Sequence, residues 1–421
     1  VERLKHPLLR VRPHPAPGVR HRDPLVMPFS HVQFLSDIGI INADRLGADD
    51  QLATVRHRVT RIECDVDQRG LQLRGVGHDR QETRRHPDTD GYLLTRGSLM
   101  FETRMSPDRR PQVLLGFDQG WPDQCSLTFQ AIPGGGISMV QVTGEHIAHA
   151  AVQHAVSART DVLRITFSWD ASRNWAQLTV ERPEEHHIST RPVRDVRPVP
   201  LAALRSLLLG KSGSSFDGDI VFAALSDTVE PIGPAPSLSP EAMVATPDGF
   251  KPAGSLTRGD TVIARGGDVV PVLHRVSRIV PARGSFAPVR LRSPYFGLRA
   301  DVIVAPEQRL VIDGSEVEYL FNEEAVLVPA RHLINGFAGL KEPSGPTADY
   351  CQLILPAHEA LIVAGCAVES LYIGRLRRKP EMLAQTLLRG IDRNTLPEHG
   401  RAAFKELKWF EAIHLARQRV A

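Results

Sequence analysis

The sequence has few cysteines, no long apolar run and no excess of one charge, and each of these absences excludes a class of protein. The four cysteines are Cys64, Cys125, Cys351 and Cys366. None forms a close pair, which argues against a disulfide framework or a zinc ribbon and predicts buried free thiols. No apolar stretch approaches the roughly 20 residues needed to cross a bilayer. The net charge of +3 has no dominant block, so nucleic-acid binding is not expected.

Histidines are more numerous but loosely placed. His146, His149 and His154 form one group, and His186 and His187 form a pair. Residues three apart in a strand point to opposite faces, so these spacings do not suit a zinc site. No metal and no cofactor are predicted.

Residues 1–24 contain five arginines, one lysine and five prolines with almost no apolar periodicity. This composition predicts a basic flexible tail. No signal peptide is visible in the chain as given, which begins at Val1, and the compartment is left open, export included.

Short alternating stretches between residues 25 and 227 predict β-strands. In "LRITFSWD" the apolar side chains Leu163, Ile165, Phe167 and Trp169 fall on one face, and "WAQLTVE" resumes the alternation after the turn residues "ASRN". Other short strands are separated by Gly/Pro turns, and long helical periodicity is absent. The pattern predicts a jelly-roll-like antiparallel sandwich.

A proline-rich segment at 228–236 follows, in which an extended linker without regular pairing is expected. Strand-like runs then resume. The last 46 residues, 376–421, favour helix, with Pro380 at a helix start and the spacing of Phe404, Leu407, Phe410 and Ile413 indicating an amphipathic segment. The whole chain is therefore predicted to be mainly β with a short helical C-terminal extension.

Three stretches between 237 and about 375 resemble the Hedgehog/intein (Hint) family of bacterial proteins. They are "ATPDGFKPAGSLTRGDTVIA", "DVIVAPEQRLVI" followed by "AVLVPARHLING", and "YCQLILPAHEALIVAGCAVESLY". The resemblance implies a compact β horseshoe over residues 237–375. It also implies self-cleavage by a nucleophile at the first residue, helped by an acid or base and by polar groups around the scissile amide.

The resemblance places Ser237 at the nucleophile position, Thr246 in the opening turn and Gln308 at the position of a block histidine. It also places Gln352 where a histidine is common, and His358 in the late block. These five residues are the candidate catalytic set.

This sequence departs from the family's pattern at most of these positions. Ser237 stands in place of the usual cysteine, Ala305 in place of a hydroxyl residue, and Pro356 in place of an aspartate. Both glutamines lack a proton to exchange near neutral pH, which leaves His358 as the one titratable group. The sequence therefore favours a degenerate Hint domain kept as a scaffold, beside the alternative of cleavage between Pro236 and Ser237 by an N-to-O acyl shift.

The stretches "VLRITFSWDASRNWAQLTVE" and "DGDIVFAAL" in the sandwich are similar to concanavalin-like (laminin G-type) domains. That similarity implies a surface that binds carbohydrate or another protein. Trp175, directly after a turn, is the candidate ligand-binding residue. A secreted glycan-active protein is a further alternative, although no pair of carboxylates with glycosidase spacing stands out.

Overall fold

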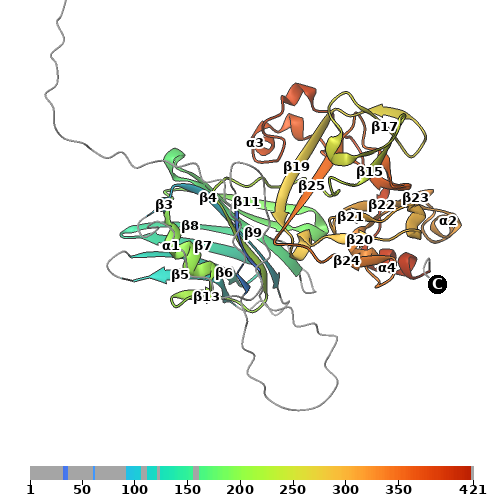
Figure 1. The fold of residues 1–421 in the computed structure, drawn as a ribbon. Coiled ribbons are helices and arrows are strands. Elements are labelled where there is room, and N and C mark those ends of the chain that lie inside the picture. The colour runs from blue at the N-terminus through green and yellow to red at the C-terminus, as the bar shows by residue number, and fades with distance from the viewer. Residues whose placement is uncertain are drawn as a thin grey trace, which may run out of the picture. The chain divides into compact units, whose positions relative to one another are not determined.

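The computed structural model describes residues 32–36, 60–61, 92–105, 111–120, 124–154 and 161–418. The predicted tail at 1–24 and Cys64 lie outside these residues. The fold is mainly β, as the alternation predicted, and Figure 1 shows the order of its elements along the chain. No helix in the described part of the chain is long and apolar enough to cross a membrane.

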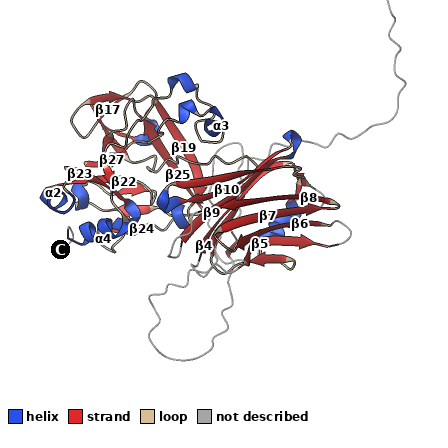
Figure 2. Ribbon diagram, turned by 180° about the vertical axis from the view of Figure 1, so that it is seen from behind, coloured by secondary structure: helices blue, strands red, loops and turns tan. Residues whose placement is uncertain are grey.

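Two antiparallel sheets form the N-terminal sandwich (Figure 2). The first has the order β11-β10-β9-β4-β14-β1-β2, with the bounds β1 Val32–Ser36, β2 Thr60–Arg61, β4 Arg96–Met105, β9 Asp161–Asp170, β10 Trp175–Arg182, β11 His187–Val193 and β14 Ile220–Ser226. The second has the order β13-β5-β6-β7-β8, with the bounds β5 Gln112–Gln119, β6 Cys125–Ile132, β7 Gly136–Thr143, β8 His146–Gln153 and β13 Ser214–Phe216. A short pair, β3 (Leu93–Leu94) and β12 (Val199–Pro200), and helix α1 (Leu201–Leu208) complete it.

The space between these two sheets is filled by the apolar side chains of the alternation. Leu163, Ile165, Phe167 and Trp169 of β9 are all fully buried there. The ring of Trp169 stacks on Phe167 with their centroids 5.3 Å apart, and its Nε1 donates to the carbonyl of Leu94 at 2.9 Å. Trp169 is therefore a core residue, on the same buried face as the three apolar residues with which it alternates.

The other face of the first sheet is largely polar across β4, β9 and β10, yet it is buried as well. We call it the covered face and define it by three rows across β4, β9 and β10: Ser98–Ser168–Gln177, Met100–Thr166–Thr179 and Glu102–Arg164–Glu181. All nine side chains are buried. A strand that alternates apolar and polar residues normally turns its polar face to water, so the sequence pattern did not reveal that this face is covered.

The remainder of the described chain, residues 237–418, is the C-terminal β region. Its largest sheet has the order β16-β15-β26-β27-β22-β23-β28, with the bounds β15 Met243–Thr246, β16 Gly249–Pro252, β22 Arg309–Asp313, β23 Ala325–Pro329, β26 Ala360–Val363, β27 Cys366–Glu369 and β28 Lys405–Glu406. Smaller sheets are β17-β18 (Thr261–Ile263, Val269–Pro271), β19-β25 (His274–Pro281, Thr347–Ile354) and β21-β20-β24 (Val302–Val304, Val289–Leu291, Gly339–Lys341). Short helices are α2 (Ser315–Phe321), α3 (Pro380–Leu383) and α4 (Trp409–Gln418).

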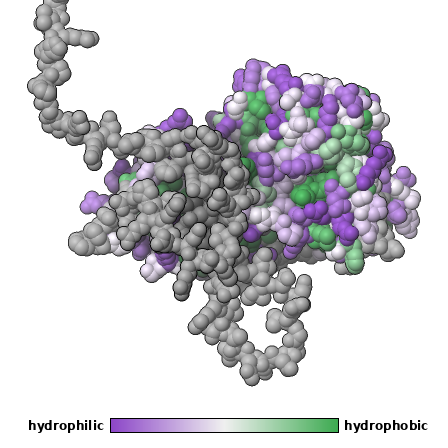
Figure 3. All heavy atoms as spheres, viewed as in Figure 1, coloured by the Kyte–Doolittle hydropathy of each residue, from purple (hydrophilic) through white to green (hydrophobic). Residues whose placement is uncertain are grey.

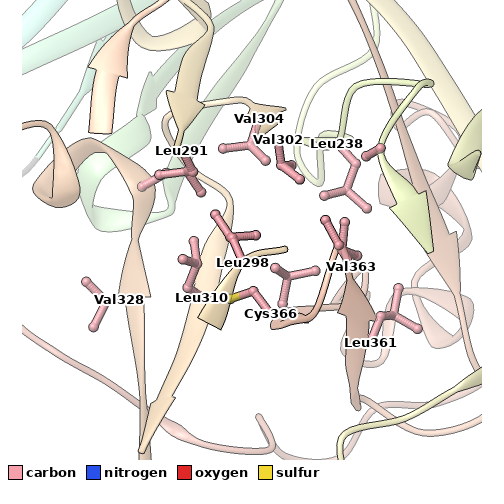
Figure 4. Packing of buried hydrophobic residues seen from close by; sticks show 14 of the residues in the cluster. Leu238, Leu291, Leu298, Val302, Val304, Leu310, Val328, Leu361, Val363 and Cys366 are labelled. Atoms are coloured by element: carbon pink, nitrogen blue, oxygen red, sulfur yellow. The ribbon is translucent and has the colours of Figure 1, made fainter. Parts of the chain in front are cut away.

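Aliphatic side chains from these sheets form one core (Figure 4). Leu238, Val304 and Val363 are fully buried in it, together with Cys366. Burial raises the pKa of the Cys366 thiol to about 12. Cys125, Cys351 and Cys366 are all free and buried, which confirms the expected state of the described cysteines. On the face shown in Figure 3, small hydrophobic areas alternate with hydrophilic ones over the coloured surface.

The C-terminal segment ends in a short helix, as predicted, and packs in this core. Helix α4 begins only at Trp409, while Lys405 and Glu406 pair in parallel with β23. Leu407 and Leu415 are buried in the core that Figure 4 shows in part. The helical spacing predicted a longer helix here, but a free sheet edge satisfies the backbone of residues 405–406 instead.

The proline-rich segment 228–236 has neither helix nor strand. Three of its amides are nevertheless hydrogen-bonded to other elements. Glu230 N donates to Ser98 Oγ at 2.8 Å, Ile232 N to Gln385 O at 3.0 Å, and Gly233 N to Glu181 Oε1 at 3.2 Å. The segment is therefore tied along its length to other elements.

Candidate functional site

Ser237 is held between two strands of the C-terminal β region. Its carbonyl accepts a hydrogen bond from Ala305 N at 2.7 Å, and the next residue, Leu238, exchanges backbone hydrogen bonds with Cys351 of β25 at 2.8 and 3.0 Å. The side chain of Ser237 lies among buried groups and is 8% exposed. The peptide bond between Pro236 and Ser237 is therefore fixed by backbone pairing on its C-terminal side.

Two glutamine side chains meet the Ser237 hydroxyl. Ser237 Oγ donates to Gln308 Oε1 at 2.7 Å and accepts from Gln352 Nε2 at 3.2 Å, and Gln352 Nε2 also lies 2.9 Å from Gln308 Oε1. Gln308 Nε2 donates to the carbonyls of Arg309 and Glu369 at 2.9 and 3.2 Å. Three of the five predicted site residues are thus brought together in one hydrogen-bonded cluster, which we call the amide cluster (Ser237, Gln308, Gln352).

The amide cluster determines the chemistry of the hydroxyl. An amide oxygen accepts a hydrogen bond but does not take up a proton near neutral pH. Among the described residues, no hydrogen bond joins Ser237 Oγ to a carboxylate, an imidazole or an amine. The cluster therefore holds the serine in its neutral form.

His358 is engaged in a separate network. Its Nδ1 accepts from Ala403 N at 3.0 Å, so that nitrogen carries a lone pair and the ring proton is on Nε2. Nε2 lies 2.8 Å from Glu369 Oε1, a close charge contact in which the two atoms are not aligned for a hydrogen bond, and the ring packs against Tyr372 with centroids 4.9 Å apart. Both nitrogens are thus directed at groups other than Ser237.

The network extends from Glu369 to the sandwich. Arg309 pairs with Glu369 and, at 2.6 Å, with Glu406, whose other oxygen lies 3.2 Å from His186 Nε2. Burial raises the pKa of Glu406, but hydrogen bonding to His186 and the charge of Arg309 outweigh it and lower the pKa to about 2. Glu406 is therefore a carboxylate at any physiological pH and ties β28 to β22.

The remaining predicted positions lie outside the amide cluster. Thr246 ends β15, and its hydroxyl donates to Gly249 O at 2.6 Å within the turn, with no hydrogen bond to Ser237 in the described chain. Ala305, which replaces the hydroxyl residue of the family pattern, is buried in an apolar cluster with Phe286 and Tyr350. Pro356 is exposed.

A cavity of about 440 Å³ opens beside Ser237. Its walls come from the sandwich, from segment 233–237 and from the C-terminal β region, and include Arg182, His187, Arg309 and Tyr372. Acidic and basic side chains both line it, so no single charge is favoured. The described residues contain no group of three His, Cys, Asp or Glu side chains placed to hold a metal ion.

Sequence reasoning missed Arg309 and Glu406, because their pairing joins residues 97 positions apart. It also missed the ionic row of the covered face. The one signal for that row was the presence of Arg164 and Glu181 at corresponding positions of the two strands of a predicted hairpin.

Residues 236–375 match the family model described as the Hint domain, and this stretch is a Hint domain. The match leaves the N-terminal sandwich outside it. Comparison with curated proteins finds no match.

Two of the similar solved structures are inteins. The gp41-1 intein is 12% identical with a TM-score of 0.21, over 31% of this chain and 95% of that one. The MchDnaB-1 intein (N145AA) is 13% identical with a TM-score of 0.23, over 32% and 98%. The LG1-3 region of the laminin alpha2 chain is 7% identical with a TM-score of 0.23, over 66% of this chain and 53% of that one.

Proposed function

We propose that the Hint domain no longer cleaves itself and acts as a scaffold for the N-terminal sandwich, which binds a ligand. The amide cluster carries this proposal. Its two glutamines satisfy the Ser237 hydroxyl both as donor and as acceptor, and neither exchanges a proton. We place the functional parts at 25–227 for the sandwich, 228–236 for the linker and 237–375 for the Hint domain.

The rate enhancements that acid–base and oxyanion groups normally contribute support loss of cleavage. Attack by Ser237 Oγ on the Pro236 carbonyl requires removal of the hydroxyl proton, and a positioned acid or base contributes roughly 10²–10⁴-fold to such a step. A missing donor to the developing oxyanion costs a further factor on the order of 10²–10³. With the imidazole of the family pattern replaced by Gln308, the N-to-O acyl shift has no catalyst for its first proton transfer.

Intact mass of the purified full chain tests this proposal. After prolonged incubation with and without hydroxylamine, we expect a single species of 46.4 kDa. The Ser237→Ala chain is the matched control and should give the same result. Fragments that end at Pro236 in the wild-type chain but not in Ser237→Ala would contradict the proposal and establish the acyl shift.

The ligand that we propose for the sandwich is a carbohydrate. Trp175 is the first residue of β10, directly after Asn174, and it is half-buried. By the alternation of β10 it lies on the same face of the sheet as Gln177. A tryptophan at such an edge offers an apolar ring surface with one side open to a sugar.

A further inference from the structure

The covered face is mostly polar across β4, β9 and β10, whereas the neighbouring positions of β14, Phe222 and Ala224, pack in an apolar cluster with Phe286. Two of its three rows, Ser98–Ser168–Gln177 and Glu102–Arg164–Glu181, are entirely polar. Permanent interfaces are mostly apolar, whereas contacts between parts of one chain that move apart are more polar. Replacing a buried ion pair by apolar side chains is often neutral or stabilising, so permanent burial gives no reason to keep these groups.

The cover itself comes from three segments. The linker contributes the amides of Glu230 and Gly233 to the face, as described above. The 3-10 helix Gly284–Phe286 contributes Ser285, whose N–H donates to Glu102 at 2.9 Å and whose hydroxyl accepts from Arg164 at 2.9 Å. The C-terminal segment contributes Gln385, which accepts from Gln177 Nε2 at 3.0 Å.

The fit between face and cover is incomplete. Thr166 Oγ1 of the face and Arg278 Nε of the cover are buried without a hydrogen-bond partner among the described residues. A buried polar group left in this way destabilises the closed arrangement. Arg278 is paired with Glu230 through Nη2 at 3.1 Å, and burial lowers its pKa. Opening of this interface would let water hydrogen-bond to the polar groups that lack a described partner in the closed arrangement.

We propose that the covered face is the ligand-binding surface of the sandwich and that the C-terminal β region is a reversible cover over it. This rests on the proposed function, in which the sandwich binds a carbohydrate, and it adds how that binding is controlled. Opening separates the two parts about the linker 228–236, which has no helix or strand. It must also break the hydrogen bonds that Glu230 and Gly233 of the linker make to the face. In the closed chain the ligand and the cover compete for the same side chains.

The chemistry of the face fits a hydroxyl-rich, uncharged ligand. Hydroxyl and amide groups of Ser168, Gln177 and Thr179 both donate and accept, as sugar hydroxyls do. The positive charge of Arg164 is matched by Glu181, whose carboxylate lies 2.9 Å away. A phosphate-bearing ligand needs an excess of positive charge, which this face does not offer. Trp175 stands at the edge of the same face.

Two glycines provide a matched pair of variants. Gly284 has φ +58, and a Cβ there would overlap Glu102 Oε1 and lie 2.7 Å from its Cδ. Gly144 has the same φ, but a Cβ there meets nothing within 4 Å. Gly284→Ala therefore combines the backbone strain of a left-handed alanine with a clash across the cover, and Gly144→Ala has the strain alone.

The experiment measures pelleting of the full chain with insoluble cellulose, chitin, xylan and curdlan, and the radius of gyration by small-angle scattering. We expect Gly284→Ala to expand and to bind one of these polysaccharides at least about tenfold more tightly than wild type, because apparent affinity is proportional to the open fraction. Gly144→Ala should match wild type. Adding Trp175→Ala to Gly284→Ala should abolish the gain.

Phe286→Ala provides a second route to opening that leaves the sandwich core intact. The Phe286 ring lies under the Arg164 guanidinium at 4.2 Å and packs in the apolar cluster with Phe222 of the sandwich. The proposal is wrong if both variants stay compact, if an expanded variant binds none of the four polysaccharides, or if wild type binds as tightly as the variants. Intact mass, which tests loss of cleavage, is independent of all three results.

Discussion

Replacing Ser237 by cysteine and Gln308 by histidine should produce a chain that breaks between Pro236 and Ser237 in the presence of a thiol or hydroxylamine. The thiol introduced by Ser237→Cys attacks the Pro236 carbonyl carbon, the bond to the nitrogen of residue 237 breaks, and that nitrogen takes a proton. A thioester results, which hydroxylamine then cleaves. The reaction needs a nucleophile that ionises and a group that donates the proton.

The amide cluster explains why both changes are needed. Gln308 Oε1 lies 2.7 Å from Ser237 Oγ, so an imidazole from Gln308→His is within reach of the nucleophile. A thiol with a pKa near 8.5 is a few per cent ionised at pH 7, whereas a serine hydroxyl is not measurably so. We expect the double variant to cleave about 10²–10⁴-fold faster than Ser237→Cys alone.

Mass spectrometry over time measures this rate. The control is a second double variant, which combines Ser237→Ala with Gln308→His. It carries the imidazole without a nucleophile and should remain uncleaved. A double variant that also stays whole after days in hydroxylamine would show that the fold, and not these two side chains, prevents cleavage.

The second large effect concerns Glu102 and pH. Burial raises the pKa of Glu102 to about 7, although the Ser285 hydrogen bond and the charge of Arg164 lower it, and Glu307 adds to the rise. In the unfolded chain its pKa is near 4.5. The folded chain therefore binds more protons than the unfolded chain between these values, and its free energy of unfolding falls as pH rises from about 4.5 to 7.

Glu102→Gln should remove this dependence, because glutamine has the shape of the protonated side chain and no charge to bury. At pH 8 we expect the variant to be more stable than wild type by up to about 3 kcal/mol, and near pH 4.5 to be equal to it. Urea unfolding at pH 5, 6, 7 and 8 measures the difference. Glu145→Gln, at an exposed position, is the control. If the free energy of unfolding changed equally with pH in wild type and in Glu102→Gln, the raised pKa of Glu102 would be contradicted.

Local patterns were sufficient to predict the strands. The alternation from Leu163 to Trp169 identified both β9 and its buried face, because a strand with one face in a core must alternate. It could not predict the burial of the other face. The alternation predicts that a polar row such as Ser168 and Gln177 faces water. This row is buried only because residues far along the chain pack over it.

The site was predicted in part by resemblance. Ser237, Gln308 and Gln352 do meet, because Gln352 lies in β25, Gln308 directly precedes β22, and Leu238 beside Ser237 is paired with β25. Thr246 and His358 are used elsewhere, the first in a turn and the second by Ala403 and Glu369. The tail residue Ala403 lies outside the Hint stretch, so no pattern within that stretch reveals how His358 is occupied.

The strand β28 has a consequence for how this Hint domain can be used. A gene fragment cut where the family match ends, at residue 375, would lack β28 and α4. Leu327 would then lose the backbone partner that Leu407 provides at 3.0 Å, and the sheet would end at an open edge. Open edges pair with other chains. The Hint domain of this protein is therefore not self-sufficient as a module for protein fusions. Fused to another protein without residues 376–421, it would expose a sheet edge that promotes aggregation.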